Sequence, residues 1–200
     1  MTTRSTSRTQ PPAIRRTQIL EAAKRCFRKA GFHATTIAEI AKAARVSVGL
    51  IYRFFPSKES LIQGIVHEDL NRLIEVLNDV LDQHPDEMLA TAIGSKGFLN
   101  ILFDKERATL MLEIAAESSR NKKIRAISKP NQKKLNELFG ERVQALRPLS
   151  WSADETQARI QLTNALLSGI VIETVFRTDP PKPVFLELLS QVIRQLLFTA

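Results

Sequence analysis

The stretch Thr35–Leu61 constrains the fold of this chain more than any other, because it contains three helix starts separated by two short breaks. Thr36 and Glu39 have the spacing of a capping box, in which the hydroxyl accepts a backbone N–H and the carboxylate reaches back. Ser47 is a second N-cap candidate, and Pro56 stops the helix that follows it, just before a third helix start. The pattern predicts two short helices joined by a tight turn, followed by a third helix.

The apolar residues of this stretch show which faces of the two short helices point inward. The first helix has apolar residues at i, i+3, i+4 and i+7: Ile37, Ile40, Ala41 and Ala44. In the second helix Ile51 and Phe55 lie four residues apart and share an inward face, so Val48, Tyr52 and Arg53 point elsewhere. A helix pair with a partly unburied second helix is the arrangement that places a helix in the DNA major groove. An ordinary αα-hairpin in a helical bundle is the alternative.

The amino-acid identities in this stretch are more specific than its helical pattern. Its characteristic residues are Ala41, Ala44, Val46, Ser47, Gly49, Tyr52, Phe55, Ser57, Lys58, Glu59 and Leu61. In these residues the chain closely resembles the N-terminal signature of the TetR/AcrR family of transcriptional regulators, over roughly residues 14 to 66. The resemblance implies an all-α homodimer with an N-terminal three-helix helix-turn-helix domain and a C-terminal ligand-sensing and dimerisation domain. It also implies a repressor that binds a palindromic operator and releases it when a small molecule binds.

The resemblance, together with the helix pattern, predicts a DNA-binding surface. Its members are Thr35, Thr36, Arg45, Ser47, Val48, Gly49, Leu50, Tyr52, Arg53 and Lys58. Tyr52 and Lys58 match family positions that hold phosphates, and we expect a hydroxyl or backbone N–H contact from Thr35 or Thr36. Gly49 allows close approach of the second helix to DNA.

Four positions in this surface are specific to this chain. Val48 and Leu50 stand where family members often carry Lys and Thr, which favours apolar contact with thymine methyl groups. Arg53 is the best local candidate for a guanine or phosphate contact. Arg45 occupies the turn position where family members commonly have Gly, so we expect a left-handed backbone there, which costs a non-Gly residue roughly 1 kcal/mol.

The net charge of +8 is concentrated at the N-terminus. Residues 1–60 hold 12 of the 29 Lys and Arg but only 3 of the 21 Asp and Glu, a net charge of +9, so the other 140 residues carry −1. This indicates a polyanion partner for the first part and a different task for the second. A membrane surface could also attract the charge, but no basic amphipathic helix with a Trp- or Phe-rich face accompanies it. We predict domains at 13–60 and 61–200.

Residues 1–12 are polar and basic and predict a flexible tail. Within it, Arg4 and Arg8 could contact phosphates or enter a minor groove, or remain solvated. The single cysteine, Cys26, cannot form an internal disulfide, and no apolar stretch follows the first arginines. The longest apolar run is shorter than the roughly 20 residues that span a bilayer. We therefore expect a soluble cytoplasmic protein.

The sequence lacks the motifs of an enzyme: no P-loop, no GxGxxG and no GxSxG is present. Ser119 and Lys122 have the spacing of a serine/lysine pair, but nothing else of that motif follows, which indicates a polar helix end. His67 has no second His four residues on, so it does not predict a metal site. We expect no catalytic residues, no metal and no cofactor.

The remaining apolar periodicity is helical throughout, which predicts about nine helices and no sheet. The first spans about 13–30, with a core stripe that ends at Gly31 as a left-handed C-cap. Its stripe residues are Ile19, Ala23, Cys26, Phe27 and Ala30. A long helix over about 57–84 links the two domains. The later helices are expected over about 85–103, 104–120, 121–147, 153–177 and 183–198.

The helices over 104–120 and 153–177 are apolar nearly all round, as helices buried on every side are. The last helix has an apolar stripe as well, so the two terminal helices need more cover than their own chain offers. We therefore expect a two-fold four-helix dimer interface, the pair of helices that the family resemblance also implies. Its expected residues are Leu166, Gly169, Ile170, Phe185, Leu189, Val192 and Leu196.

The same apolar excess predicts a ligand pocket. Its candidate residues are Leu73, Leu77, Phe103, Met111, Glu113, Phe139, Trp151, Asn164 and Ser168. Glu173 has Arg177 at i+4 as an ion-pair partner, whereas Glu113 has no basic residue at i±3 or i±4. Glu113 must find a partner on another helix, face solvent or meet a ligand. In the last case the inducer would be lipophilic and either cationic or rich in hydrogen-bond donors. The alternative function is an architectural or partner-recruiting DNA-binding protein without a ligand, which solid packing here would favour.

Overall fold

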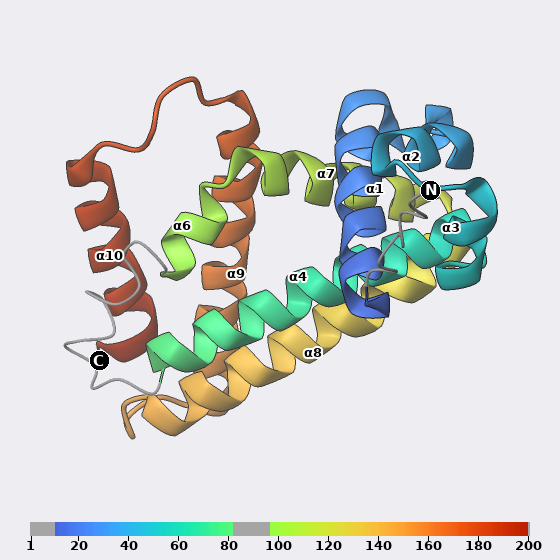
Figure 1. Cartoon of the computed structure of the whole chain (residues 1–200). Coiled ribbons are helices and arrows are strands. Elements are labelled where there is room, and N and C mark those ends of the chain that lie inside the picture. Colours follow the sequence, from blue (N-terminus) through green and yellow to red (C-terminus); the bar gives the residue numbers. More distant parts are fainter. Residues whose placement is uncertain (1–10, 82–96, 200) are drawn as a thin grey trace, which may run out of the picture. The chain divides into compact units, whose positions relative to one another are not determined.

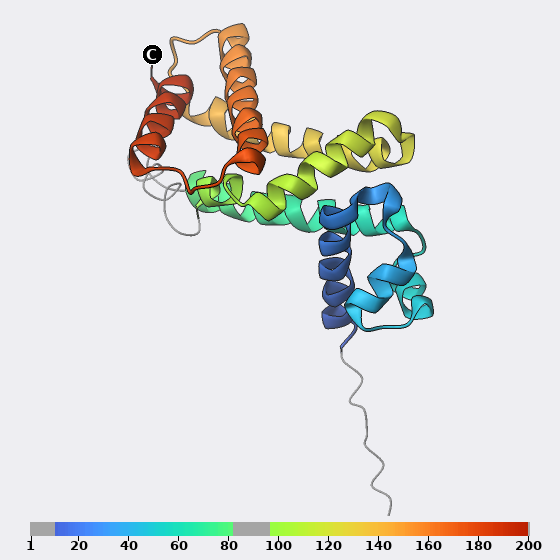
Figure 2. The ribbon, with the colours of Figure 1, turned by 90° about the horizontal axis from the view of Figure 1, so that it is seen from above.

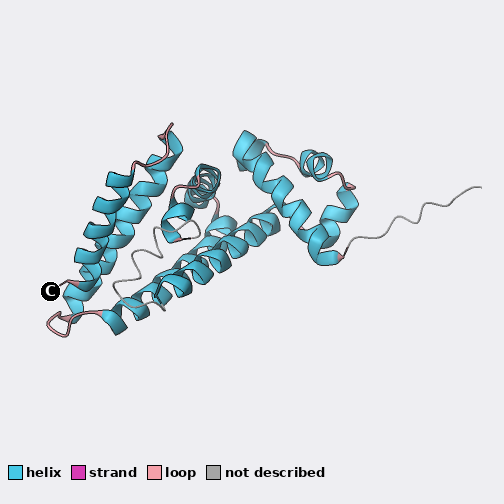
Figure 3. Ribbon diagram, turned by 60° about the vertical axis from the view of Figure 1, so that its left-hand side comes forward, coloured by secondary structure: helices cyan, strands magenta, loops and turns pink. Residues whose placement is uncertain are grey.

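The structure is a computed structural model that describes residues 11–81 and 97–199. The described residues form helices joined by loops and contain no strand (Figures 1 and 3). In chain order the helices are α1 (Pro12–Ala34), α2 (Ile37–Ala44), α3 (Val48–Phe54), α4 (Lys58–Leu81), α6 (Phe98–Leu102), α7 (Lys105–Arg120), α8 (Lys122–Leu146), α9 (Ala153–Phe176) and α10 (Pro183–Phe198). The all-α prediction is confirmed for these residues. The tail arginines Arg4 and Arg8, and most of the helix expected over 85–103, lie outside them.

The chain divides into two compact units, Met1–Ile65 and Val66–Ala200, which we call the N-terminal and C-terminal units. In the N-terminal unit, α1 packs along α2, and α2 contacts α3. The buried core of this unit consists mainly of aliphatic side chains from all four of its helices: Ile19, Leu20, Ala23, Phe27, Ile40, Ala41, Ile51, Leu61, Ile62 and Ile65. A side chain of α1 also holds the end of α2, because Gln18 Nε2 donates to the carbonyl oxygen of Ala44 over 2.7 Å.

The end of α1 differs from the expectation. The buried stripe stops at Phe27: Cys26 is only half-buried and Ala30 is exposed. The ring of Phe27 instead packs 5.5 Å from that of Phe32, beyond the expected helix end, and closes this part of the core. Gly31 has φ 77° and ψ 167°, a positive φ outside the left-handed helical region, and one more helical turn follows it. Gly31 is therefore a kink within α1, and the predicted C-cap is wrong.

The C-terminal unit contains α6 to α10 and the part of α4 from Val66 onward. Among its described residues, clusters of buried side chains are centred on Leu77, on Leu102 with Ile170 and Leu189, and on Val143 with Leu197, and further residues such as Leu110, Ile114 and Ile124 are also buried. α9 contacts α6, α7, α8 and α10, and Figure 2 shows α9 and α10 side by side, joined by the loop over 177–182.

The sequences of α7 and α9 suggest that both helices are buried on every side, but neither of them is. Ala115 and Ala116 of α7 are exposed, and so are Leu162, Ile172 and Phe176 of α9. An apolar residue on a helix reports only that water is a poor environment for it, and not which neighbour covers it. In α9 the exposed apolar positions form a face of their own, opposite the residues that enter the protomer core.

Candidate DNA-binding surface and ligand cavity

The N-terminus of α2 has the capping box that the sequence predicts. Glu39 N–H donates to the Thr36 hydroxyl over 3.2 Å, and Thr36 N–H donates to the Glu39 carboxylate over 2.7 Å. The hydroxyl of Thr36 donates to the same carboxylate. These hydrogen bonds, the backbone one first, lower the pKa of Glu39 below its ordinary value. Thr36 remains exposed, so its DNA contact stays a prediction.

The turn between α2 and α3 is left-handed at Arg45, as predicted. Arg45 has φ 54° and ψ 46°, and it is the only non-glycine residue with positive φ in the part of the chain that the structure describes. Arg45 N–H donates to the Lys42 carbonyl over 3.2 Å, and Val46 N–H donates to the Ala41 carbonyl over 3.0 Å. This pair of bonds is the Schellman motif, which usually has Gly at the left-handed position.

The second short helix, α3, has an inward face and an outward face. Ser47 caps it by accepting the Leu50 N–H over 3.1 Å. Ile51 and the following Phe55 are buried, whereas Val48 and Tyr52 are 40% and 49% exposed. Apart from the chain neighbours of Gly49 and the backbone of α3, no atom lies within 4 Å of the position that a Cβ on Gly49 would occupy. The outward α3 surface therefore consists of exposed residues that no other part of the unit covers: Ser47, Val48, Gly49, Tyr52 and Arg53. Leu50 is half-buried at its edge.

The burial of Thr35 contradicts its predicted DNA contact. Thr35 is 2% exposed, and its hydroxyl donates to the carbonyl oxygens of Gly31 and Cys26 over 2.8 and 3.1 Å. The Gly31 carbonyl also accepts the backbone N–H of Thr35 over 3.3 Å, so Thr35 is tied to α1 through both its backbone and its side chain. Thr35 thus holds the end of α1 and cannot reach a phosphate.

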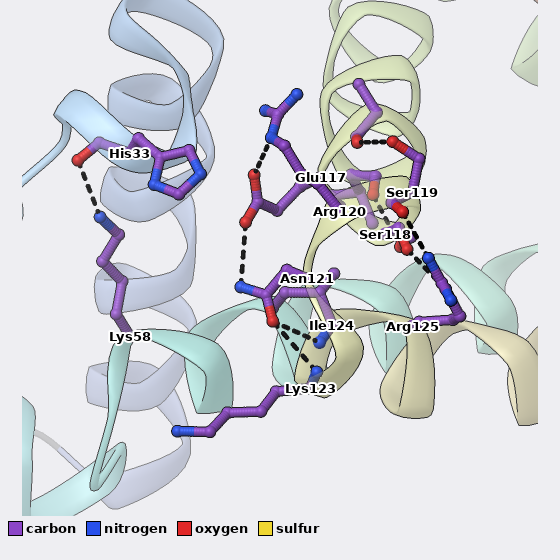
Figure 4. Close-up of polar contacts among 12 residues, drawn as sticks. His33, Lys58, Glu117, Ser118, Ser119, Arg120, Asn121, Lys123, Ile124 and Arg125 are labelled. Carbon is purple, nitrogen blue, oxygen red and sulfur yellow. Dashed lines mark hydrogen bonds and ion pairs between the residues drawn. The ribbon is translucent and has the colours of Figure 1, made fainter.

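Lys58 has a structural role that the sequence did not reveal. Its ammonium group donates to the carbonyl oxygens of Thr35 and His33 over 2.7 and 3.3 Å, the latter bond visible in Figure 4, and lies 4.4 Å from the centre of the Phe32 ring. Two of its three donors therefore stabilise the segment that connects α1 to α2. The phosphate contact of Lys58 stays a prediction, but without DNA its side chain is already hydrogen-bonded within the N-terminal unit.

Two adjoining cavities, with volumes of about 350 and 150 Å³, occur in the C-terminal unit, and both are partly open, because lining residues such as Gln132 and Ser168 are exposed. Both are lined by Leu73 of α4, Arg107 of α7, Gln132 and Leu135 of α8, and Ser168 and Val171 of α9. Six of the nine predicted pocket residues line one or both cavities: Leu73, Leu77, Met111, Phe139, Asn164 and Ser168.

The other three predicted pocket residues lie elsewhere. The Phe103 ring packs edge-on 6.1 Å from Phe185, and Trp151 is buried beneath the Arg159 guanidinium at 4.0 Å. Both aromatic side chains are thus used in packing within the protomer. Glu113 is half-exposed and borders neither cavity. Of the outcomes that its sequence context leaves open, the structure therefore does not support a ligand contact of Glu113 in these two cavities.

Spacing along the sequence does not reveal the ion pair in the cavity wall. Arg107 of α7 donates from Nε and Nη2 to the two carboxylate oxygens of Asp69 on α4, over 2.6 and 2.8 Å. The two side chains are only 11% and 17% exposed. The residues lie 38 positions apart in the chain, so helical spacing gave no signal of their contact. The predicted pair between Glu173 and Arg177 is confirmed, at 2.6 Å.

The fully buried carboxylate of α7 is Glu117 rather than Glu113. Figure 4 shows it at the turn into α8, where it accepts from Arg120 Nε and Asn121 Nδ2, each over 2.9 Å. Asn121 caps α8 through the N–H groups of Lys123 and Ile124, and Arg125 donates to the last carbonyls of α7. The turn between the two helices is thereby fixed by side chains on both sides.

The apolar residues expected at a dimer interface are divided between the protomer core and its surface. Five of the seven enter the core clusters or pack against them: Leu166, Ile170, Phe185, Leu189 and Leu196. Only Gly169 and Val192 are exposed. The exposed apolar face of α9 and α10, as we define it, consists of Ala158, Leu162, Ala165, Gly169, Ile172 and Phe176 on α9 and Val184, Leu188 and Val192 on α10. The exposed apolar residues of the two helices thus differ in part from the seven expected ones, and the interface itself stays a prediction.

The described residues contain no group of three His, Cys, Asp or Glu side chains that could hold a metal ion. None of their helices is long and apolar enough to cross a membrane.

Comparison with known proteins identifies the family. Residues 19–65 match the model for bacterial regulatory proteins of the tetR family. The HTH-type transcriptional regulator UidR of Escherichia coli (strain K12) is 30% identical over 169 residues, which cover 81% of this chain and 84% of UidR. GusR of Salmonella enterica, a solved structure, has 25% identity and a TM-score of 0.69, and the likeness covers 96% of this chain and 99% of GusR.

A second solved structure shares the fold at lower identity. The regulator FadR of Bacillus subtilis, solved in complex with stearoyl-CoA, has 20% identity and a TM-score of 0.72, covering 92% of this chain and 98% of FadR. The capped α2, the left-handed turn and the outward surface of α3 lie within the residues that match the family model. The chain therefore belongs to the TetR family of ligand-responsive bacterial repressors, and it is a helix-turn-helix, DNA-binding transcriptional regulator.

Proposed function

We propose that this protein is a cytoplasmic homodimer that represses transcription from a two-fold symmetric operator and releases the DNA when a small molecule fills the cavities of the C-terminal unit. The observation that carries the proposal is the combination of a basic helix-turn-helix with an exposed outward α3 surface and a second unit that contains lined cavities. The cavities favour this function over a ligand-free architectural protein, for which solid packing would be expected.

For DNA, we propose that Val48, Gly49 and Tyr52 face the major groove and its edge, with Arg53 reading a guanine or holding a phosphate. Arg45, Ser47, Leu50, Thr36 and Lys58 complete the proposed surface at its margins. Val48 has no hydrogen-bonding group, so its contribution to sequence preference is apolar contact with a thymine methyl group. Thr35 has no place in this surface because it is buried.

The DNA proposal is tested by selecting bound sequences from a random duplex library with the full-length protein, and by measuring affinity against salt. If Arg53 holds phosphates, Arg53→Ala in both protomers lowers the slope of log K against log salt by about two, at roughly 0.9 per contact. If Arg53 reads guanine, the selected motif loses that guanine at each half-site. Lys134→Ala, the same charge change on the exposed surface of α8, is the control. A variant with neither change would remove Arg53 from the interface.

For dimerisation, we propose that the exposed apolar face of α9 and α10 binds a second copy. On α9 this face repeats at intervals of four and three residues and includes three small residues, Ala158, Ala165 and Gly169. A glycine inside a helix costs about 1 kcal/mol relative to alanine, and apart from its chain neighbours and the backbone of α9 no atom of this chain lies within 4 Å of where a Gly169 Cβ would be. Close approach of a partner helix gives that glycine a physical reason.

The oligomeric state tests this interface. Leu162 is 58% exposed on α9, so Leu162→Asp should leave the fold intact but convert the dimer to a monomer in sedimentation analysis. Leu149, fully exposed in the loop before α9, provides the matched control: Leu149→Asp should remain dimeric. If Leu162→Asp sediments as a dimer at micromolar concentration, the interface lies elsewhere.

A further inference from the structure

The ligand cavities are nearly neutral in their chemistry, and this property limits what they can bind. Of the described residues that line them, only Asp69 and Arg107 are ionisable. These two form one bidentate ion pair, in which both carboxylate oxygens accept from the guanidinium. The pair contributes polarity to the wall but no net charge.

The remaining polar wall consists of amide and hydroxyl groups on α8 and α9: Ser128, Asn131, Gln132, Asn136, Asn164 and Ser168. Some of their hydrogen-bonding capacity is used internally. Asn131 Nδ2 donates to the Ile127 carbonyl, and Gln132 Nε2 donates to Asn136 Oδ1. Each of these bonds uses one atom of the amide, so carbonyl oxygens of Asn131 and Gln132 can still accept and the amide nitrogen of Asn136 can still donate.

Apolar side chains provide the rest of the lining, chiefly leucines of α4 and α8 together with Met111 and Phe139. A charged ligand would leave water for a site in which, among the described lining residues, the one cation and the one carboxylate are already bonded to each other. Its charge would have to compete with that pair for a partner, which is unfavourable. A neutral molecule meets no such penalty.

We infer that the inducer is an uncharged amphipathic molecule, with an apolar body and with hydroxyl or carbonyl groups that bond the amides of α8 and α9. This inference rests on the proposed ligand site. In it, the pair between Asp69 and Arg107 stays closed and excludes anions and cations equally. Glu113, which the sequence had suggested as an anchor for a cationic inducer, plays no part.

The pair can be unbalanced in either direction, which makes the inference testable. Asp69→Asn leaves a net positive charge in the wall, Arg107→Gln leaves a net negative charge, and the double variant restores neutrality. The probes are nine compounds in three charge classes: the N-acetyl amides, the N-acetyl acids and the free-amine amides of leucine, phenylalanine and tryptophan. Binding is measured by saturation-transfer NMR titration with the full-length protein. Ser168→Phe, which places a large side chain in both cavities, identifies binding at this site.

We expect the wild type and the double variant to bind the neutral amides at least tenfold more tightly than the charged probes. Asp69→Asn should shift preference toward the acids and Arg107→Gln toward the amines, each by about tenfold, and Ser168→Phe should weaken all binding. Wild-type preference for a charged class, unchanged preferences in both single variants, or no binding by any probe at millimolar concentration would overturn the inference. The DNA affinity of the same preparations separates failure of the inference from failure of the proposed function. A protein that binds its selected operator but prefers charged probes refutes only the inference.

Discussion

Replacement of Arg45 by glycine should stabilise this protein, although it removes a positive charge from the DNA-binding unit. The backbone of Arg45 is left-handed and completes the Schellman motif at the end of α2. That conformation costs a residue with a Cβ about 1–2 kcal/mol, which glycine avoids. The greater freedom of glycine in the unfolded chain takes back about 0.4–1 kcal/mol. The expected net gain for Arg45→Gly is therefore about 0.5–1 kcal/mol.

Urea unfolding followed by circular dichroism measures this gain, with Arg45→Ala as the matched control. Alanine removes the same charge and the same long side chain but keeps the Cβ, so it keeps the strain. Arg45→Gly should exceed Arg45→Ala by roughly 1 kcal/mol, which corresponds to about 2–4 °C in the melting temperature of a chain of this size. Both variants should lose DNA affinity to a similar extent, because both lose the charge. If the two variants unfold at the same urea concentration, the argument from backbone strain is refuted.

Three further predictions concern the N-terminal unit. A Cβ on Gly64 would lie 2.9 Å from Leu20 Cδ2 in the packed core. Gly64→Ala should therefore destabilise the protein by about 0–2 kcal/mol in the same unfolding assay, because the cost of overpacking is partly offset by the higher helix propensity of alanine. Gly49 has open space around it, so Gly49→Ala should stabilise α3 by up to about 1 kcal/mol. Hydrogen bonds to the α2 N-cap lower the pKa of Glu39 in the folded state, so the stabilising contribution of Glu39 is present above pH 4.5 and is lost as the pH falls below that value. The urea midpoint of Glu39→Gln should therefore fall less over this range than the urea midpoint of the wild type. Burial, and secondarily the charge of Glu39, raises the pKa of Cys26, so alkylation at pH 8 should be slower in the native protein than in urea, and equal rates would contradict the burial.

The features that the sequence predicted well depend on residues close together in the chain. A capping box, an N-cap serine and a helical ion pair are each determined by side chains no more than four positions apart, whereas the left-handed turn is expected from the family resemblance. The structure has all four, at Thr36, Ser47, Arg45 and Glu173. Helix positions in the described residues followed for the same reason, to within a few residues at most ends.

The features that were missed depend on contacts between distant residues. Periodicity cannot distinguish the side of α10 that enters the protomer core from the side that stays exposed, because Leu188 and Leu189 are equally apolar. Nor could it show that Thr35 and Lys58 would meet at the end of α1, or that Asp69 would pair with Arg107. Spacing along the chain also does not show that the fully buried acid of α7 is Glu117, since burial depends on neighbouring helices.

The division of apolar side chains on α9 and α10 has a thermodynamic consequence. Part of the hydrophobic free energy of these helices is gained when the protomer folds, and in the proposed dimer the part that belongs to Leu162, Phe176, Val184 and Leu188 is gained when a second copy covers them. Folding and association are then linked by mass action, so the melting temperature rises with total protein concentration. At low copy number, each protomer would be both less often paired and more often open to proteolysis. The lifetime of the regulator would thus depend on its own abundance.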